Sequence, residues 1–464
     1  MVFLERRIVQ LFRAAVKRCT ERPTTRADQV PVQIRLTPDG LQMHASMPDV
    51  TVIYSQPEPV GNDVFTFPLS RLGEWEGRTA DLIEIGRVSP DLASVRWPER
   101  GRQRQMEIPL LEPETMSPLP ELPKKFTAMP SDFLQSLYDV SQTTADEPTK
   151  YLVNRVQFRG KHGTIAGTDT RQLLVCGGFK FPFTEDLLLP RATVFGLPPF
   201  RQAEDVGIAR TAKHVAIRVS PWTIVFRIDT DGRFPDFAAI VPRPSNSNMR
   251  LRLAAEDGQR FLDSLARRVK GSGVKDDAVT LDTHEVACLR FELEGRVTEV
   301  KLVNSQFSGK PTRICFNLPQ LLRMLELRFN EFEIRDPDKP IVARDGERLF
   351  LSMLLSPILA IPPCPNAYQV PDDVQTPTQP LAVARRGTRS PVVISNSPVV
   401  PAQSVAFDLL DEAEGLRDGL FKVASHAGRI LRFLRETCTQ QQLLHLARTS
   451  LLALGTPTNR GGTQ

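Results

Sequence analysis

The sequence has few cysteines, and those cysteines show no pairing pattern. Six occur in 464 residues, far apart and without a Cys-x-x-Cys motif: Cys19, Cys176, Cys288, Cys315, Cys364 and Cys438. Isolated cysteines with apolar neighbours are typical of reduced thiols in a core, and not of a disulfide-stapled secreted domain. We therefore expect an intracellular protein.

The sequence also lacks a long hydrophobic run. The longest, from Leu349 to Ile361, is interrupted by Ser352, Ser356 and Pro357. It is too short to span a bilayer. The amino-terminal residues do not contain the uninterrupted apolar core of a signal peptide. These absences predict a soluble cytoplasmic protein without a membrane partner.

Residue types that commonly act in catalysis or metal binding do not form an active-site pattern in this sequence. The histidines are isolated and none lies at metal-ligand spacing from a cysteine or carboxylate: His44, His162, His214, His284, His426 and His445. Asp169 and Asp231 have no paired acid at catalytic spacing, and residues 308–310 (Ser-Gly-Lys) lack the upstream glycine of a phosphate loop. We expect no catalytic residue, no metal and no cofactor.

The sequence also has only a small excess of positive charge. Lys and Arg number 59 against 54 Asp and Glu, which leaves a net charge of +5. Any affinity for nucleic acid must therefore come from the arrangement of basic residues. The 41% hydrophobic content is enough for cores, and the length predicts about two to four domains.

The feature that is present is an internal repeat. Three amphipathic helices are predicted from Leu4, Ser131 and Glu256, and their starts lie about 125 residues apart. A second short apolar helix recurs in each unit at FPLSRLGEW, LPRATVFGL and FNLPQLLRML, and alternating strand-like runs follow each of them. We predict an α+β fold of three repeated domains, each with two helices packed on antiparallel sheets. Three unrelated α+β domains of similar size remain the alternative.

Proline-rich connectors indicate the domain boundaries. They lie at residues 110–125 and 241–248. The predicted organisation is domain 1 over 1–112, domain 2 over 126–242, domain 3 over 243–361, a Pro/Ser-rich flexible linker over 362–405 and a helical extension over 406–464.

Several stretches resemble the bacterial DNA polymerase III beta subunit, the sliding clamp. They are DEPTKYLVNRVQFRGKHGTIAGTDTRQLLV at 146–175, DGRFPDFAAIVPR at 231–243, and FNLPQLLRML followed by DPDKPIV in the third unit. The resemblance covers residues 1–359 in order. It implies the DNA-clamp fold, a head-to-tail homodimeric ring around double-stranded DNA without sequence preference, and a processivity role at the nucleoid. DNA polymerase, a clamp loader and repair proteins are the partners that it implies.

A ring around DNA needs basic residues on its inner helices, because phosphates are bound without reading bases. On the first helix the apolar positions are Leu4, Ile8, Leu11 and Ala15, opposite Arg6, Gln10, Arg13 and Lys17. The second unit's first helix carries no basic residue. The predicted DNA contacts are Arg6, Arg13, Lys17, Arg191, Arg260, Arg267, Arg268, Lys270, Arg323 and Arg328. The alternative for each helix is an ordinary solvated face.

The resemblance also implies an apolar pocket between domains 2 and 3 for partner peptides. Its predicted residues are Thr168, Thr170, Arg171, Leu173, Pro242, Met353 and Leu354. The family's Thr-Asp-Gly-His-Arg-Leu is replaced here by residues 168–173, Thr-Asp-Thr-Arg-Gln-Leu, and its closing Met-Pro-x-Arg-Leu by residues 353–357. We expect a pocket that is either retuned to a dedicated partner or vestigial.

The carboxyl-terminal extension has a heptad pattern. Apolar residues repeat every seven positions over residues 409–434 in two interleaved series, which predicts a coiled coil or helical hairpin. A helix packed on the chain's own surface is the alternative. For the whole chain, the competing function is a clamp-derived interaction scaffold that no longer encircles DNA.

Overall fold

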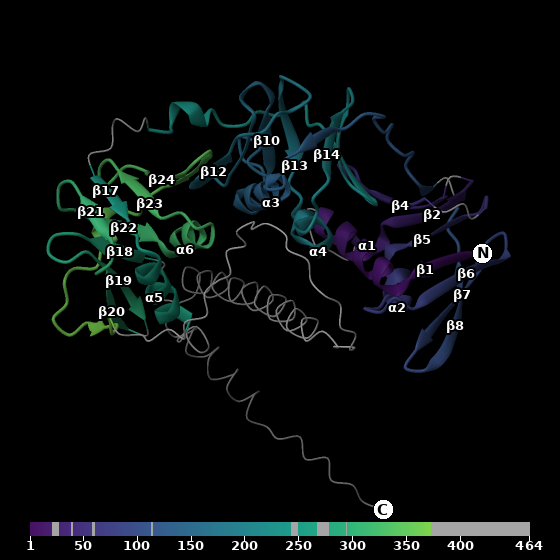
Figure 1. Cartoon of the computed structure of the whole chain (residues 1–464), viewed down its shortest axis with the longest axis horizontal. Helices are drawn as coiled ribbons and strands as arrows, with labels where there is room; N and C mark the ends of the chain where they lie inside the picture. Colours follow the sequence, from purple (N-terminus) through teal and green to yellow (C-terminus); the bar gives the residue numbers. More distant parts are fainter. Residues whose placement is uncertain are drawn as a thin grey trace, which may run out of the picture. The chain divides into compact units, whose positions relative to one another are not determined.

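The computed structural model describes residues 1–20, 27–38, 40–57, 61–112, 115–242, 249–266, 278–293 and 295–372. These ranges contain helices and antiparallel sheets, as predicted for an α+β fold (Figure 1). Within them, no helix is both long and apolar enough to cross a membrane. The predicted helical extension over 406–464 and most of the predicted linker lie outside the described residues.

The same order of elements occurs three times: a strand, a helix, four strands, a second helix and three strands. The first repeat has β1 (Val2–Glu5), α1 (Arg6–Cys19), β2 (Pro31–Thr37), β3 (Gly40–Ser46), β4 (Val50–Gln56), β5 (Val64–Pro68), α2 (Leu72–Trp75), β6 (Leu82–Ser89), β7 (Leu92–Glu99) and β8 (Arg102–Pro109). The second has β9 (Thr127–Met129), α3 (Phe133–Thr143), β10 (Arg155–Arg159), β11 (Thr164–Thr168), β12 (Gln172–Cys176), β13 (Asp186–Pro190), α4 (Pro198–Arg201), β14 (Val206–Arg210), β15 (His214–Val219) and β16 (Trp222–Arg227).

The third repeat adds one strand inside the pattern and is followed by one more. It has β17 (Met249–Arg252), α5 (Ala255–Ala266), β18 (Ala278–Asp282), β19 (Cys288–Leu293), β20 (Arg296–Lys301), β21 (Gln306–Ser308), β22 (Arg313–Asn317), α6 (Leu318–Glu326), β23 (Glu331–Ile334), β24 (Ile341–Asp345) and β25 (Arg348–Ser352), and then β26 (Tyr368–Gln369). The predicted repeat is therefore confirmed, with an insertion and an addition in its last copy.

Neighbouring repeats are joined edge to edge, so that their sheets are continuous. The sheet β5-β2-β3-β4 of the first repeat continues into β16-β15-β14-β9 of the second, where Trp222 pairs with Tyr54. The sheet β13-β10-β11-β12 continues into β25-β24-β23-β17-β21 of the third, where Leu173 pairs with Leu351. We call these contacts the β4–β16 joint and the β12–β25 joint. Two sheets remain, β1-β6-β7-β8 and β22-β18-β19-β20-β26.

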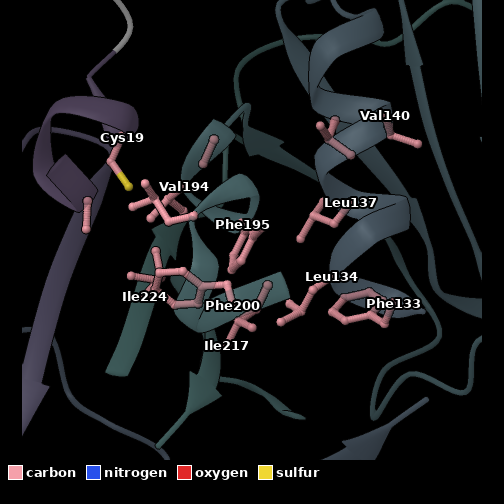
Figure 2. Packing of buried hydrophobic residues seen from close by; sticks show 14 of the residues in the cluster. Cys19, Phe133, Leu134, Leu137, Val140, Val194, Phe195, Phe200, Ile217 and Ile224 are labelled. Atoms are coloured by element: carbon pink, nitrogen blue, oxygen red, sulfur yellow. The ribbon is translucent and has the colours of Figure 1, made fainter. Parts of the chain in front are cut away.

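Helices α1, α3 and α4 contribute side chains to the main hydrophobic core. Figure 2 shows Leu134 and Leu137 of α3 facing Phe195 and Phe200, which lie on the 3-10 turn Thr193–Gly196 and on α4. Cys19, at the end of α1, lies near the same turn (Figure 2). Burial of these aromatic and aliphatic side chains stabilises the second repeat by about 1.5–3 kcal/mol each. The first repeat joins this core where Phe12 of α1 and Phe200 of α4 both pack against Trp222.

The segments between repeats cover the outer faces of the joints. Leu119 and Phe126, in the first connector, pack against Ile53, Ala216 and Val225. Strand β4 is therefore buried on both faces from Val50 to Tyr54, which explains why its sequence does not alternate. Residues 234–241, which follow β16, cover the β12–β25 joint in the same way, as described below.

A third segment follows the third repeat, and it corrects the predicted start of the linker. The Leu355 amide donates to the Cys315 carbonyl at 2.8 Å, and the Ile361 amide donates to Thr280 Oγ1 at 2.7 Å. Residues up to 372 then pack beside β20. The proline content of this stretch resembles a flexible linker, but its backbone donors are used on the third repeat.

Candidate nucleic-acid and partner-binding sites

Helix α1 begins two residues later than the sequence pattern predicts. Leu4 lies in β1, where it pairs with Ile83 of β6, and the helix starts at Arg6. Its fully buried residues are Val9, Phe12, Ala15, Val16 and Cys19. The buried face is therefore rotated relative to the predicted one, and the basic residues are redistributed around the helix.

Arg6 of α1 anchors the helix through backbone carbonyl groups. Its guanidinium donates to the carbonyl oxygens of Trp75 at 3.1 Å, Glu76 at 2.9 Å and Pro98 at 2.9 Å. These bonds tie α1 to the end of α2 and to β7. Arg6 was predicted to contact DNA. Its guanidinium instead donates to three carbonyl groups of its own repeat, which would lose these hydrogen bonds if Arg6 turned to a phosphate.

Other basic residues of α1 are partly neutralised by acids. Arg13 lies 2.7 Å from Glu76, and Lys17 lies 3.0 Å from Asp28. Burial raises the pKa of Glu76, although Arg13 partly offsets that effect. Arg18 is exposed and was missed by the sequence analysis. Counting the helix from the buried positions Val9, Phe12 and Val16 would have placed it on the solvent side.

In the second repeat, the predicted contact Arg191 lies just after β13. It donates to the Ala145 carbonyl at 3.3 Å and to Asp146 at 2.7 Å, so it holds the chain that follows α3. Arg201, at the end of α4, is exposed above the ring of Tyr138 at 5.4 Å and was not predicted. The only signal for it in the sequence is its place at the end of the second helix.

Arg260 of α5 is buried, which contradicts its prediction as a DNA contact. Its side chain is 7% exposed and donates to Asp257, to Asp372 and to the Lys301 carbonyl, at 2.6, 2.6 and 2.7 Å. Burial lowers the pKa of Arg260, but the two carboxylates raise it overall. The predicted contacts Arg267, Arg268 and Lys270 lie outside the described residues.

Of the two basic residues predicted at α6, Arg323 contacts another repeat and Arg328 is exposed. Arg323 donates to the Asp139 carbonyl at 3.2 Å and to its carboxylate at 3.3 Å, and so links α6 to α3 of the second repeat (Figure 1). Arg328 follows the helix, is exposed and has a φ of 61°. Asp139 explains part of the acidic character of the second unit's first helix, since it binds a neighbouring repeat.

The predicted partner pocket is brought together at the β12–β25 joint. The Met353 amide donates to the Arg171 carbonyl at 2.8 Å, directly beyond the paired strands. The turn before β12 is closed by side chains: Thr168 Oγ1 accepts from the Thr170 amide at 3.0 Å, and Asp169 accepts from the amides of Arg171 and Gln172 at 2.9 and 2.8 Å.

Thr170 occupies a strained position in this turn. Its φ is 80°, in the left-handed region that a β-branched residue rarely adopts. Glycine adopts this conformation without a steric penalty, because it has no Cβ. Side-chain capping by Thr168 and Asp169 compensates for the strain.

Replacing Thr170 with glycine is expected to raise the free energy of unfolding by about 1 kcal/mol, because the left-handed conformation then costs no steric energy. Urea denaturation of the full chain measures the change. Arg171→Gly is the matched control, since Arg171 is not among the residues with positive φ and its replacement gains nothing. Equal or lower stability of Thr170→Gly would show that the turn is not strained.

The apolar part of this site is covered by residues that follow β16. Leu173 and Leu351 are buried together with Ala166 and Val342, and Phe234, Phe237 and Val241 pack against them. Phe234 and Phe237 face this one cluster, with ring centroids 6.3 Å apart.

The rim of the site combines fixed and exposed positions. The Pro242 carbonyl accepts from Arg344 at 2.9 Å, which fixes the connector to the third repeat. Met353 is 41% exposed, whereas Leu354 packs partly on the main core. Within the site, Leu173 and Leu351 are therefore covered, whereas Met353 is exposed.

Solved structures with the same arrangement are bacterial clamps. The DNA polymerase III subunit beta of Pseudomonas aeruginosa matches with a TM-score of 0.61 and 18% identity, over 76% of this chain and 99% of that one. The chain has the DNA sliding-clamp fold. The sliding clamp of Bacillus subtilis (15% identity) and the beta sliding clamp of C. crescentus (19%) each match with a TM-score of 0.61, over 76% of this chain and 98% of theirs.

The predicted resemblance to the sliding clamps is thus confirmed for the fold. No family model and no curated protein matches the sequence. Recognition of the sliding-clamp fold therefore depends on the order of its elements and not on overall identity. The clamp structures are matched over almost their whole length, so all three repeats correspond and the remaining quarter of this chain lies beyond the common fold.

Proposed function

We propose that this chain is a non-catalytic processivity factor, a sliding clamp in which two copies join head to tail around double-stranded DNA. The observation that carries the proposal is the edge-to-edge joining of its repeats. β4 pairs with β16 and β12 with β25, and the strands at the corresponding places that remain are β8 in the first repeat and β20 in the third. A third joint of the same kind, formed twice between two copies, closes a ring.

Topological linkage distinguishes this function from ordinary DNA binding. The full chain, assembled on a nicked circular plasmid, is expected to remain on it through a high-salt wash and to be released when the plasmid is linearised. A ring is lost from DNA only at free ends, whereas a surface contact is lost with salt regardless of ends. Equal loss from circular and linear DNA contradicts the proposal.

The DNA contacts proposed from the structure are the accessible basic residues of the inner helices. They are Lys17 and Arg18 of α1, Arg201 of α4 and Arg328 after α6, to which the predicted Arg13, Arg191, Arg323, Arg267, Arg268 and Lys270 are added. Arg6 is omitted because its guanidinium donates to three backbone carbonyls, and Arg260 is omitted because it is buried.

Charge reversal on α1 tests the DNA-facing side. The double variant Lys17→Glu/Arg18→Glu is expected to weaken DNA binding and to reduce the slope of log K against log salt by about 1 to 2, since each lost phosphate contact removes about 0.9. Fluorescence anisotropy over a salt series measures the slope. Arg335→Glu/Lys339→Glu, on the exposed turn before β24, is the matched control. An equal slope change in both variants would contradict the assignment to α1.

The site at the β12–β25 joint is proposed to hold a short peptide segment of a polymerase, loader or repair protein. Its exposed rim, Met353 beside Thr168–Leu173, supports that role, while the covering by Phe234 and Phe237 favours a retuned specificity. Titration with a Gln-x-x-Leu-Phe-type peptide tests it. Absence of binding at millimolar peptide removes the standard partners.

A second function has its own support. A clamp-derived interaction scaffold that does not encircle DNA is favoured by the internal use of Arg6, Arg260 and Arg323, and by the strand that lies along β20. A strictly monomeric protein at high concentration that is not retained on circular DNA would support this scaffold.

A further inference from the structure

Residues 361–372, which we call the strap, lie along the outer edge of β20. Tyr368 and Gln369 form β26 and pair in parallel with Thr298 and Glu299. The Val370 amide continues the ladder and donates to the Glu299 carbonyl at 2.9 Å. The strap therefore uses hydrogen-bonding groups at the middle of a strand edge.

Side chains hold the strap at four points. The Tyr368 ring centroid lies 5.2 Å from the Arg296 guanidinium, and Gln369 Nε2 donates to Glu299 Oε1 at 3.0 Å. Val370 is 8% exposed, and Asp372 accepts from the buried Arg260 at 2.6 Å. A buried arginine with two carboxylate partners is a specific contact, because removing either acid leaves its charge less compensated.

The position of β20 in the third repeat matches that of the two strands that join neighbouring repeats. The strands β4, β12 and β20 occupy the same position in the three repeats, each at the end of an antiparallel four-strand order. In the first two repeats this edge pairs with the last strand of a neighbouring repeat, β16 or β25. In the third repeat it pairs with β26 (Figure 1 shows β20 beside β19).

The complementary edge is β8. It has the position of β16 and β25 in its repeat, and among the described residues it pairs only with β7. Its first four residues, Arg102 to Gln105, are exposed. An uncovered strand edge of eight residues offers a row of backbone donors and acceptors to another strand.

From this arrangement we infer that the strap is a removable cap that withholds β20 from the β8 edge of a second copy. One strand edge can form only one ladder, so β26 and an incoming β8 exclude each other at Thr298 and Glu299. The cap pairs over two residues, whereas a joint between repeats pairs over five, so an incoming β8 has more hydrogen bonds to offer. The inference rests on the proposed function, because it regulates the joint that closes the ring.

A release variant tests the cap in the full chain. Tyr368→Ala removes the ring contact, Val370→Pro removes the amide donor, and Asp372→Asn removes the charge facing Arg260. Sedimentation velocity over a concentration series is expected to give a dissociation constant for self-association at least about tenfold lower than for the unchanged chain, since a smaller fraction of β20 is capped. Asn366→Ala, at an exposed strap residue, is the matched control and leaves the constant unchanged.

Two further measurements make the result specific. Hydrogen exchange at low protein concentration is expected to be faster in β20 of the release variant, which shows that the strap has left the edge. A synthetic peptide of residues 361–372 is expected to reverse the gain in self-association, because it caps β20 in trans.

The possible outcomes distinguish a failure of the proposed cap from a failure of the proposed ring. If the unchanged chain already dimerises as tightly as the release variant, the cap is overturned and the ring stands. If the release variant exposes β20 but stays monomeric at high concentration, β20 is not a subunit joint, and both the proposed ring and its cap are overturned. Tighter self-association that the peptide does not reverse also overturns the cap.

Discussion

The replacement Trp222→Ala is expected to lower the free energy of unfolding by about 3–5 kcal/mol. Trp222 is 3% exposed at the β4–β16 joint and packs against three aromatic rings. Its ring centroid lies 5.0 Å from that of Tyr54, 5.9 Å from that of Phe200 and 6.2 Å from that of Phe12. These rings come from both repeats, so one truncation opens a cavity shared by α1, α4 and β4.

The effect of Trp222→Ala should be concentrated at the joint. Urea denaturation measures the total loss, and hydrogen exchange is expected to become faster in β4 and β16. Trp97→Ala, which truncates a buried tryptophan of β7, is the matched control and should leave protection at the joint unchanged. A loss below about 1 kcal/mol, or equal exchange at the joint in both variants, would mean that Trp222 does not hold the repeats together.

Asp282→Asn is expected to destabilise the protein by about 3 kcal/mol at neutral pH, because it removes the central acid of a buried ion network. Asp282 is 3% exposed and accepts from Arg290 at 2.6 Å and from Arg313 at 2.9 Å. His284 Nδ1 lies 2.8 Å from the same carboxylate. Without this acid, Glu299 is the one ion-pair partner of the buried Arg290 among the described residues.

This network makes stability depend on pH in a defined direction. Burial alone would raise the pKa of Asp282, but hydrogen bonds from Arg290, His284 and Arg313 hold it well below its usual range. A carboxylate with a lowered folded-state pKa stabilises fully above its unfolded pKa of about 3.9 and loses that contribution as pH falls toward the folded value. The stability difference between the unchanged chain and Asp282→Asn should therefore be largest at neutral pH and shrink below about pH 4.

Denaturant midpoints measured from pH 2 to pH 7 check this dependence. Asp336→Asn, at an exposed acid beside Arg335, is the matched control and should shift the curve little at any pH. A constant difference between Asp282→Asn and the unchanged chain across the whole range would show that the lowered pKa of Asp282 does not contribute to acid sensitivity.

The repeat and its fold class were predictable because they depend on local patterns. Helix periodicity, strand alternation and the order of elements survive at low identity, since each is set by burial of one face. Phe234 and Phe237 are likewise brought together by a local feature, because Pro235 restricts the backbone between them.

The basic residues were harder to assign from sequence. Arg6 has the residue type and spacing of a phosphate contact, but its partners are carbonyl groups about seventy to ninety positions away in the chain, which no local pattern reveals. Arg260 is similar, since Asp372 lies beyond the predicted end of the third domain. Tertiary packing, and not the local sequence pattern, determines that Lys17 is exposed and Arg260 is buried.

The strap was mistaken for the start of a linker because of its composition. Residues 361–372 contain four prolines and little hydrophobic periodicity, which indicates an extended chain. An extended chain is also what a strand edge binds. The sequence pattern therefore predicted the conformation correctly, but it did not predict the surface that receives it.

The two joints within one chain differ from a joint between two chains in how they can be separated. At the β4–β16 and β12–β25 joints a covalent connector crosses the outer face, so parting the strands leaves the repeats tethered. Re-pairing at such a tethered joint is intramolecular and does not depend on protein concentration. Strands on separate chains have no tether, and their pairing follows mass action. In a two-copy assembly the joints between chains are therefore the ones that dilution opens, and the protein concentration sets the fraction of them that is closed.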